Sequence, residues 1–231
     1  MIGKSPCRDG VLDDMTDAQL WPLFGLEVST PNLALRYVTD ELAFELAALA
    51  AQGIHDPQTM PFASAWTDVA SPELERNALR YYWLRRSETS VQRWSLNFAV
   101  CVDEAVVGTC LVDAADFTST RTAETGSWLG RRYQGVGIGT EMRTAALGLI
   151  FDGLGAETAT TSAWHDNGAS LGVTRSLGYT QTGKHRQPRR GRDDEMIDFA
   201  ISRARWRARP RPPLSFKGIE ATREFLGLQG A

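Results

Sequence analysis

The sequence has few of the residues that build metal centres and disulfide frameworks. Its 231 residues include three cysteines and three histidines. Cys7, Cys101 and Cys110 are odd in number and lack the spacing of a metal site. We therefore expect no metal, no disulfide framework and a reducing compartment, the cytoplasm. We expect Cys101 and Cys110, which lie in strand-like segments, to be small core residues.

Long apolar runs and an excess of charge of one sign are also missing. No run of about 18 apolar residues occurs, so we predict no membrane span. The N-terminus carries charge and no apolar segment typical of a secretory signal. Lys and Arg number 25 against 28 Asp and Glu, a net charge of −3, which argues against a general nucleic-acid binder. Basic residues gather at 184–192 and 203–211, either as solvated surface charge or to attract an anion.

Hydrophobic periodicity and turn residues predict the element order β-α-α-β-β-β-α-β-α-β-β. The length suits one domain with appendages. We place the domain at 26–206, after an extension at 1–25 and before an Arg/Pro-rich tail at 207–231. The expected strands are 26–38, 94–102, 105–113, 121–129, 157–164, 179–187 and 194–206. The expected helices are 41–52 capped by Asp40, 73–86 after an N-cap at Ser71, 138–151, and a short helix from Asp166 closed by Gly178.

A glycine-rich turn separates the strand 121–129 from the following helix. Gly135, Gly137 and Gly139 alternate along the segment Gln134-Gly-Val-Gly-Ile-Gly139, where the lack of Cβ atoms permits close approach of a bound group. A helix N-terminus with unpaired N–H groups favours anions, above all phosphates. The segment is neither a P-loop nor a good dinucleotide fingerprint. A plain surface turn is the alternative.

Three local signatures carry a resemblance to a known family. They are the segments 123–129 (A-E-T-G-S-W-L), 133–141 around the glycines, and Asn167-Gly-Ala-Ser170 followed by Ser-Leu-Gly-Tyr179. Together with the element order, they resemble the GNAT family of N-acyltransferases over roughly 26–206. The chain is most similar to the branch that acetylates N-termini of ribosomal proteins, and to actinobacterial members, some of which use succinyl-CoA. Segments 21–24, 53–57, 60–62 and 126–130 carry the second similarity.

The resemblance implies a fold and a co-substrate site. The fold is α/β (α+β), with helices on both faces of a twisted, mixed, mostly antiparallel sheet. The co-substrate is acetyl-CoA or succinyl-CoA, whose pantetheine arm enters where the strands 121–129 and 157–164 splay apart. Backbone groups of Trp128 and Leu129 would pair with that arm, and the Leu129 N–H would donate to the developing oxyanion. Pyrophosphate would bind at Gln134, Gly135, Val136, Gly137, Ile138, Gly139 and Thr140. Asn167 would contact the arm, cap a helix, or both.

The catalytic groups are candidates carried over from the family. Thr174 occupies the place of the tyrosine acid, so we expect Ser170 to lie near the CoA sulfur, unless it only bonds locally. Glu124 is the first candidate for the base, and a surface carboxylate is its alternative. His165 and then His55 follow as candidates. Transfer without a protein base is also open.

The acceptor side is expected to be formed by residues 54–66 and the hairpin at 184–192. Possible contacts there are His55, Asp56, Trp66 and Trp83, although the aromatic residues could belong to the core. A basic hairpin residue could hold a succinyl carboxylate. The acceptor would be a protein N-terminus, a lysine or a small-molecule amine.

Two other functions remain open at this point. The first is a non-catalytic acyl-CoA-binding or sensor module. The second is a GNAT fold whose basic segment 203–211 binds a partner or nucleic acid. We expect a homodimer or larger homo-oligomer, with no nucleic-acid or membrane partner.

Overall fold

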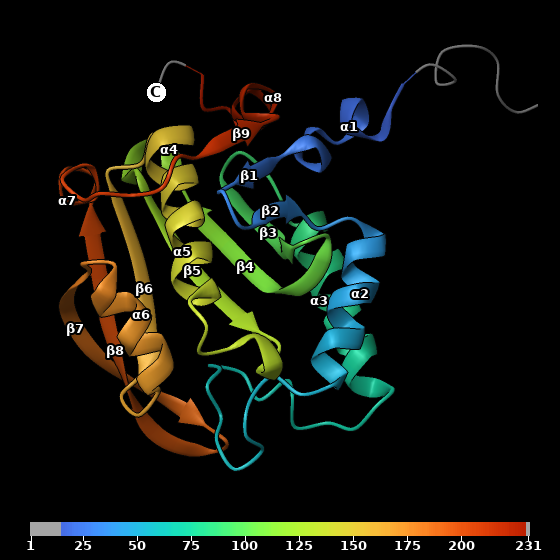
Figure 1. The fold of residues 1–231 in the computed structure, drawn as a ribbon, viewed down its shortest axis with the longest axis vertical. Helices are drawn as coiled ribbons and strands as arrows, with labels where there is room; N and C mark the ends of the chain where they lie inside the picture. The colour runs from blue at the N-terminus through green and yellow to red at the C-terminus, as the bar shows by residue number, and fades with distance from the viewer. Residues whose placement is uncertain (1–14, 230–231) are drawn as a thin grey trace, which may run out of the picture.

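A nine-stranded sheet runs through the molecule in the order β7-β8-β6-β5-β4-β3-β2-β1-β9 (Figure 1). The computed structural model describes residues 15–229. Strands β5 and β6 pair in parallel, and all other neighbours pair antiparallel. The strands are β1 (Glu27–Ser29), β2 (Ala34–Tyr37), β3 (Arg93–Val102), β4 (Ala105–Ala115), β5 (Thr122–Leu129), β6 (Thr158–Trp164), β7 (Thr180–Arg189), β8 (Arg192–Ser202) and β9 (Ser215–Lys217).

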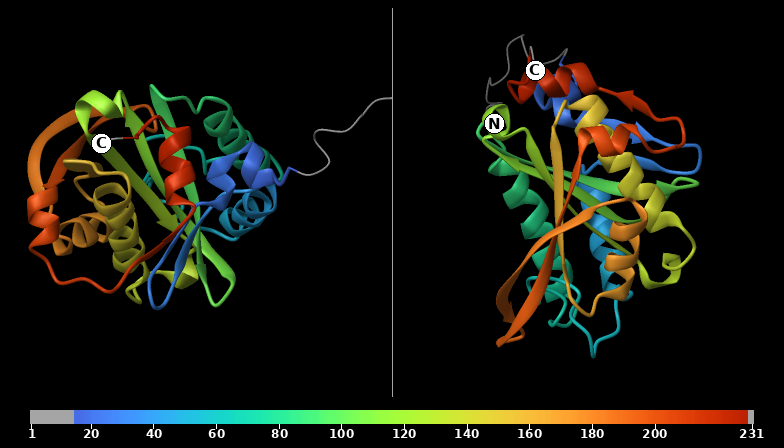
Figure 2. Two further views of the ribbon diagram at one scale, coloured as in Figure 1. Left: turned by 90° about the horizontal axis from the view of Figure 1, so that it is seen from above. Right: turned by 90° about the vertical axis from the view of Figure 1, so that its left-hand side faces the viewer.

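Helices cover both faces of the sheet, as seen from above in Figure 2. The longer ones are α2 (Asp40–Ala51), α3 (Glu73–Ser87), α5 (Ile138–Gly148) and α6 (Gly168–Ser176). The shorter ones are α1 (Asp17–Leu20), α4 (Phe117–Thr120), α7 (Arg203–Arg207) and α8 (Ile219–Phe225), with 3₁₀ turns η1 (Pro22–Gly25) and η2 (Arg131–Tyr133) and a π-turn η3 (Leu149–Gly153). The mixed, mostly antiparallel sheet with helices on both faces confirms the expected fold class.

Side-chain alternation along β3 explains the two layers. Phe98 and Val100 belong to the large core cluster that includes the buried residues of α5. Ala99 and Cys101 belong to a second cluster, with buried residues of α2 and Tyr82 of α3. Successive strand residues point to opposite faces, so α5 lies on one face and α2 and α3 on the other.

Several expected boundaries are wrong in detail. The first strand is two strands, β1 and β2, because Thr30 accepts an N–H and turns the chain at Leu33. The α2 cap is Thr39 rather than Asp40, since the Thr39 hydroxyl accepts the Leu42 N–H. At the start of α3 the cap position is Pro72 rather than Ser71.

The chain after β8 also differs from the expectation. The last long strand ends at Ser202, whose side chain accepts the Arg205 N–H and begins α7. Within the stretch 207–231, β9 pairs with β1 and extends the sheet. A Cβ at Gly148 of α5 would overlap the Leu214 side chain, so the segment before β9 passes directly over that helix. Residues 207–229 therefore form part of the packed structure.

Candidate active site

The parallel strands β5 and β6 separate part-way along their length. Their pairing joins Thr122, Ala123 and Glu124 to Thr158, Ala159 and Thr160. Beyond that point β5 continues to Leu129 and β6 to Trp164 without further pairing. We call the space between the unpaired ends the strand gap. Its position agrees with the splay between these two strands that the resemblance to the GNAT family implies.

The backbone groups of Leu129 and Ser127 face the strand gap. Gly130 N–H donates to the Val107 carbonyl at 2.9 Å, while Leu129 lies opposite Gly108. This arrangement makes Gly108 and Leu129 a non-hydrogen-bonded pair, and such pairs alternate along an antiparallel ladder. Trp128 therefore uses its backbone on β4, whereas Leu129 and Ser127 direct theirs toward β6. The sequence reasoning missed Ser127, although strand alternation contains the signal.

The glycine turn at the foot of α5 presents a run of unused donors. In the part of the chain that the structure describes, no acceptor meets the backbone N–H groups of Gly135, Val136, Gly137, Ile138 or Gly139. Gly135 and Gly137 have φ of 77° and 95°, with nothing within 4 Å of a Cβ at either position. The Thr140 N–H is already bonded to the Gly137 carbonyl at 3.1 Å. Uncommitted N–H groups at a helix N-terminus fit an anion such as pyrophosphate.

Gln134 braces this turn against its surroundings. Its Nε2 donates to the Leu129 carbonyl and to the Ile54 carbonyl, each at 2.8 Å. The side chain thus ties the end of β5 to the loop after α2. The Leu129 carbonyl is consumed in this way, which leaves the Leu129 N–H as the donor that faces the strand gap.

The start of α6 matches one expected role and leaves another open. Asn167 caps the helix, and its Oδ1 accepts the Ser170 N–H at 3.1 Å. The half-buried Ser170 hydroxyl bonds to no residue within 15–229. Thr174 is fully buried, and its Oγ1 also has no partner there. Ser170 therefore keeps a hydroxyl that is able to donate a proton.

Glu124 lies where the strand gap begins, and its environment disfavours ionisation. The surrounding protein partly desolvates its carboxyl, and the carboxylates of Asp113 and Asp198 repel negative charge, so the pKa of Glu124 rises above its ordinary value. Asp113 is its neighbour on β4. A carboxylate with a raised pKa is better matched to proton transfer near neutral pH. Its side chain remains exposed to solvent.

The two histidine candidates lie away from Glu124. His165 follows the end of β6, with Nδ1 3.3 Å from both the Glu195 carbonyl and Asp194 Oδ1. It is five residues beyond Thr160, the partner of Glu124, or about 17 Å along a strand. His55 Nδ1 faces the Asp56 carbonyl at 2.8 Å and Nε2 faces Thr67 Oγ1 at 2.7 Å. Both nitrogens of His55 are thus engaged, which favours a structural role.

A row of aromatic rings lies beside the end of β5, packed against buried residues of α2, α3 and the loop after α2. His55, Phe62, Trp66 and Trp128 follow one another with ring centroids 5.6, 5.4 and 6.2 Å apart. Trp128 shares a face of β5 with Glu124. Asp56 is occupied locally, since its Oδ1 accepts the Gln58 N–H.

Trp83 does not belong to this row. Its Nε1 donates to Asp40 Oδ1 at 3.2 Å, so it packs at the beginning of α2, whereas His55 follows its end. The helix Asp40–Ala51 has 12 residues, or about 18 Å of axis. The structure therefore brings His55, Asp56 and Trp66 together and leaves Trp83 elsewhere.

The loop 54–70 and the tip of the β7–β8 hairpin are joined across the open end of the strand gap (lower part of Figure 1). Arg190 donates to both oxygens of Asp68 at 2.6 and 2.7 Å and to the Pro57 carbonyl at 2.9 Å. Arg189 Nε donates to the Met60 carbonyl at 2.8 Å. Hydrogen bonds from Arg190 hold the pKa of Asp68 below its ordinary value. We call these contacts the clasp.

The remaining cations of the hairpin are also paired. Lys184 bonds to Glu195 at 2.8 Å, Arg186 to Asp193 at 2.5 Å, and Arg189 to Asp166 at 2.9 Å. Among the described residues of this hairpin, Arg192 is the one arginine or lysine that forms no ion pair with an acid. Most cations at 184–192 are therefore surface charges that form ion pairs within the protein. The same pairing leaves them poorly placed to bind a succinyl carboxylate.

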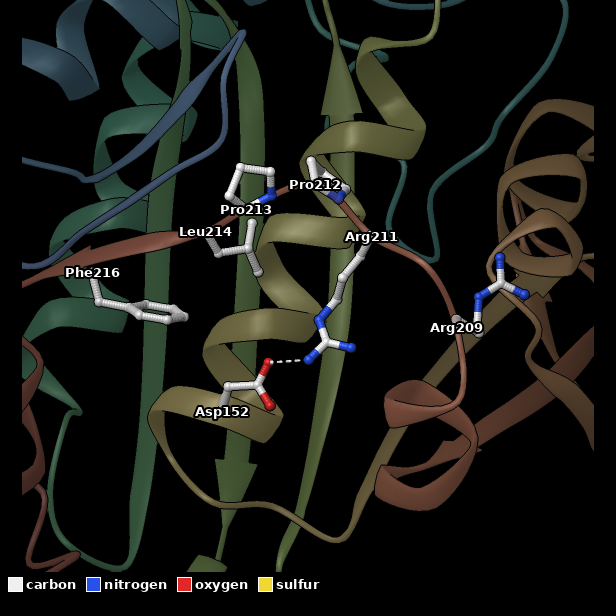
Figure 3. Close-up of a pocket in the computed structure, with 7 residues that line it drawn as sticks. All are labelled: Asp152, Arg209, Arg211, Pro212, Pro213, Leu214 and Phe216. Carbon is white, nitrogen blue, oxygen red and sulfur yellow. Dashed lines mark hydrogen bonds and ion pairs between the residues drawn. The ribbon is translucent and has the colours of Figure 1, made fainter.

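A cavity of about 480 Å³ lies far from these residues, beside the end of α5. In Figure 3, Arg211 reaches Asp152 at 3.4 Å while Arg209 lies apart from that pair. Arg209 donates instead to the Ser176 carbonyl at 2.6 Å, and Arg203 pairs with Glu157 at 3.2 Å. These contacts show that much of the basic segment 203–211 anchors α7 and the following chain.

Comparison with known proteins assigns the family. A family model described as an acetyltransferase (GNAT) domain matches residues 32–180, more than half of the chain. The chain belongs to the GNAT acetyltransferase family. Acetyltransferases of this family depend on acyl-CoA, which agrees with the free donors of the glycine turn.

Solved structures share this GNAT fold at low identity. RimJ from Mycobacterium smegmatis, in complex with CoA-disulfide, is 20% identical with a TM-score of 0.63, covering 79% of this chain and 88% of its own. The ribosomal-protein-S5-alanine acetyltransferase from Vibrio fischeri is 16% identical with a TM-score of 0.60, covering 80% and 99%. The microcin C7 self-immunity acetyltransferase MccE, in complex with acetyl-CoA and AMP, is 16% identical with a TM-score of 0.59, covering 74% and 93%.

Residues 15–229 contain neither a membrane-spanning helix nor a cluster of metal-binding side chains. No helix there is long and apolar enough to cross a membrane. No group of three or more His, Cys, Asp or Glu side chains there is arranged to hold a metal ion.

Proposed function

We propose that this GNAT protein transfers an acetyl or succinyl group from CoA to a primary amine by direct attack within a ternary complex. The run of uncommitted N–H groups from Gly135 to Gly139, at the foot of α5 and beside the strand gap, is the observation that supports this most. Its donors suit the pyrophosphate of an acyl-CoA. The thioester supplies an activated carbonyl, whose C–S bond breaks as the amine nitrogen bonds to carbon.

Backbone groups hold the reacting end in this proposal. The backbone of Ser127 pairs with the pantetheine arm as an added strand would. The Leu129 N–H donates to the negative charge that develops on the carbonyl oxygen. Trp128 contributes its side chain to the aromatic row rather than its backbone. Gln134 acts as a brace, and Asn167 positions Ser170 by capping α6.

Two side chains move protons. The Ser170 hydroxyl donates to the departing thiolate, directly or through water. Glu124 lies five residues before Leu129, or about 17 Å along the strand, so it removes the amine proton through water. His165 is a second candidate for this step. His55, Asp56 and Trp66 form the wall that meets the acceptor.

The acceptor is a primary amine on a protein N-terminus, a lysine or a small molecule. The name of the Vibrio fischeri relative, which specifies an alanine of a ribosomal protein, favours a protein N-terminus as the first to try. We also expect the chain to form a homodimer or a larger homo-oligomer, which sedimentation would test.

Thiol release tests the proposal against a non-catalytic acyl-CoA-binding module. Acetyl-CoA and succinyl-CoA are each offered with a panel of amines that includes N-terminal peptides, lysine peptides and small amines. We expect release with at least one amine, slowed in Ser170→Ala. If acyl-CoA binds and no amine in the panel gives release, the binding-module interpretation replaces the enzyme.

A further inference from the structure

Arg143 of α5 is a buried arginine that has no acidic partner in the part of the chain that the structure describes. The residue is 3% exposed, and its Nε and Nη2 atoms have no hydrogen-bond partner among residues 15–229. No carboxylate in that range forms an ion pair with it. By contrast, the partly buried Arg85 lies 2.6 Å from Asp113. A buried charge is strongly unfavourable unless it is paired, so the Arg143 guanidinium calls for an anion.

The position of α5 directs Arg143 toward the strand gap. Gly139 and Arg143 are four residues apart and share a helix face. A Cβ at Gly139 would lie 3.7 Å from Val173 of α6 and 3.8 Å from Leu129 of β5. That face therefore looks into the wedge between α5, α6 and the end of β5.

Tyr179 locates the guanidinium within this wedge. Arg143 Cζ lies 5.9 Å from the centre of the Tyr179 ring. The Tyr179 hydroxyl is 3.5 Å from Thr125 Oγ1, and Thr125 is the first residue after the β5–β6 pairing ends. The guanidinium thus lies on the α5 side of β5, and its charge acts on Cys110, the β4 partner of Ser127.

Nothing else in the wedge neutralises this charge. Burial raises the pKa of Cys110 to about 11, even though the positive charge of Arg143 acts in the opposite direction. Cys110 is therefore a neutral thiol near pH 7. Thr174, whose carbonyl accepts the Tyr179 N–H, has a buried hydroxyl without a partner in the described chain. Among the described residues, the wedge therefore offers hydroxyl groups and a neutral thiol, but no carboxylate that pairs with Arg143.

We propose that Arg143 binds a carboxylate at the far end of the acyl group, so that the site prefers a dicarboxylic acyl-CoA over acetyl-CoA. The proposal rests on the acyltransferase function above and names its acyl class. A guanidinium matches a carboxylate through paired hydrogen bonds. The pyrophosphate has its own donors at Gly135–Gly139. The hairpin arginines that are alternatives for this role already bind Asp68, Asp166 and Asp193.

Calorimetric titration of the full chain with CoA, acetyl-CoA and succinyl-CoA tests the proposal. We expect wild type to bind succinyl-CoA most tightly. In Arg143→Met, the succinyl-CoA affinity should fall on the order of 100-fold, because one partner of a desolvated charge pair is removed. Affinities for CoA and acetyl-CoA should stay within about threefold, since neither carries the carboxylate. Arg175→Met on α6 is the matched control, because Arg175 is exposed and the charge change is the same.

Two results would overturn the proposal while leaving the acyltransferase intact. One is an equal loss for all three ligands in a folded Arg143→Met, which would place the guanidinium on the CoA moiety. The other is a wild type that binds acetyl-CoA as tightly as succinyl-CoA. If Arg143→Met does not fold, wild type is titrated with the CoA thioester of succinamic acid, which should bind as weakly as acetyl-CoA. Failure of wild type to bind any CoA species would sink the proposed function itself.

Discussion

The glycine turn below α5 and the hairpin tip between β7 and β8 flank the same strand gap and use their donors in opposite ways. The turn has no cationic side chain between Gly135 and Gly139. Its backbone N–H groups can nevertheless bind an anion, because they donate to no acceptor in the described chain. The hairpin is rich in Arg, yet Arg186, Arg189 and Arg190 are bonded to carboxylates. Anion binding depends on uncommitted donors, and a count of positive residues does not measure them.

The largest expected effect is on acetyl-CoA binding, and it should distinguish substitutions at two glycines with similar backbone conformations. Gly137 and Gly191 have φ of 95° and 75°, and at both a Cβ would meet nothing within 4 Å. Gly137→Glu puts a carboxylate among the turn donors and should weaken acetyl-CoA binding by at least about 100-fold, because like charges then face each other. Gly191→Glu should bind acetyl-CoA normally. Equal losses in calorimetry would show that backbone strain alone is responsible.

Glu124 and His165 lie at opposite ends of the strand gap, and substitutions at the two positions should change kcat/KM differently. Glu124→Gln should lower kcat/KM on the order of 100-fold, because a general base contributes about that much. In wild type, kcat/KM should fall as the pH drops below the raised pKa of Glu124, since the protonated carboxyl cannot accept the amine proton. This acidic limb should disappear in Glu124→Gln and remain in His165→Gln. The reverse pattern would assign the base to His165.

Trp66 and Trp83 are both candidate contacts for the acceptor, but only substitution of Trp66 should affect KM for the amine. Trp66 belongs to the row beside Trp128, with ring centroids 6.2 Å apart, whereas Trp83 bonds to Asp40. Trp66→Ala should raise KM for the amine roughly tenfold, because a ring in contact with a ligand contributes about 1 kcal/mol or more. Trp83→Ala should leave it unchanged. A rise in Trp83→Ala alone would move the acceptor to the α2–α3 side.

Opening the clasp should have the smallest effect. Arg190 and Asp68 are about one-third exposed, and such pairs contribute about 0.2–1 kcal/mol. We expect Arg190→Met and Asp68→Asn each to raise KM for the amine by roughly fivefold at most and to leave the Kd of acetyl-CoA unchanged. The double variant should add little, since both changes remove one contact. Additive effects would mean that the two residues act separately.

Local signals predicted the frame of the molecule well. Alternation and turn residues located β3, β4, β5 and the cap at Asn167, because these features depend on neighbours in the chain. The glycine turn was also readable, since alternate glycines before a helical pattern have few structural uses. The roles of the individual site residues stay predictions, which the variants above test.

Long-range contacts supplied what the sequence could not show. The Arg190–Asp68 pair joins residues more than 120 positions apart, so the basic hairpin looked like an available cationic patch. Local sequence does not mark Arg143 as buried, because its burial depends on distant parts of the chain such as Tyr179. Trp66 and Trp83 were both possible acceptor contacts from the sequence, yet Trp83 packs at the beginning of α2 and Trp66 lies beside Trp128.

The close passage of Leu214 over Gly148 links the far end of the chain to co-substrate binding. A chain shortened before Leu214 would lose the side chain that covers this turn of α5, and with it β9. Helix α5 begins at the glycine turn. Loosening of its far end would therefore weaken the rigid support for the N–H donors of that turn. Affinity for CoA should therefore fall when the segment from Leu214 to β9 is removed, although that segment lies away from the glycine turn. This matters when choosing where to truncate the protein.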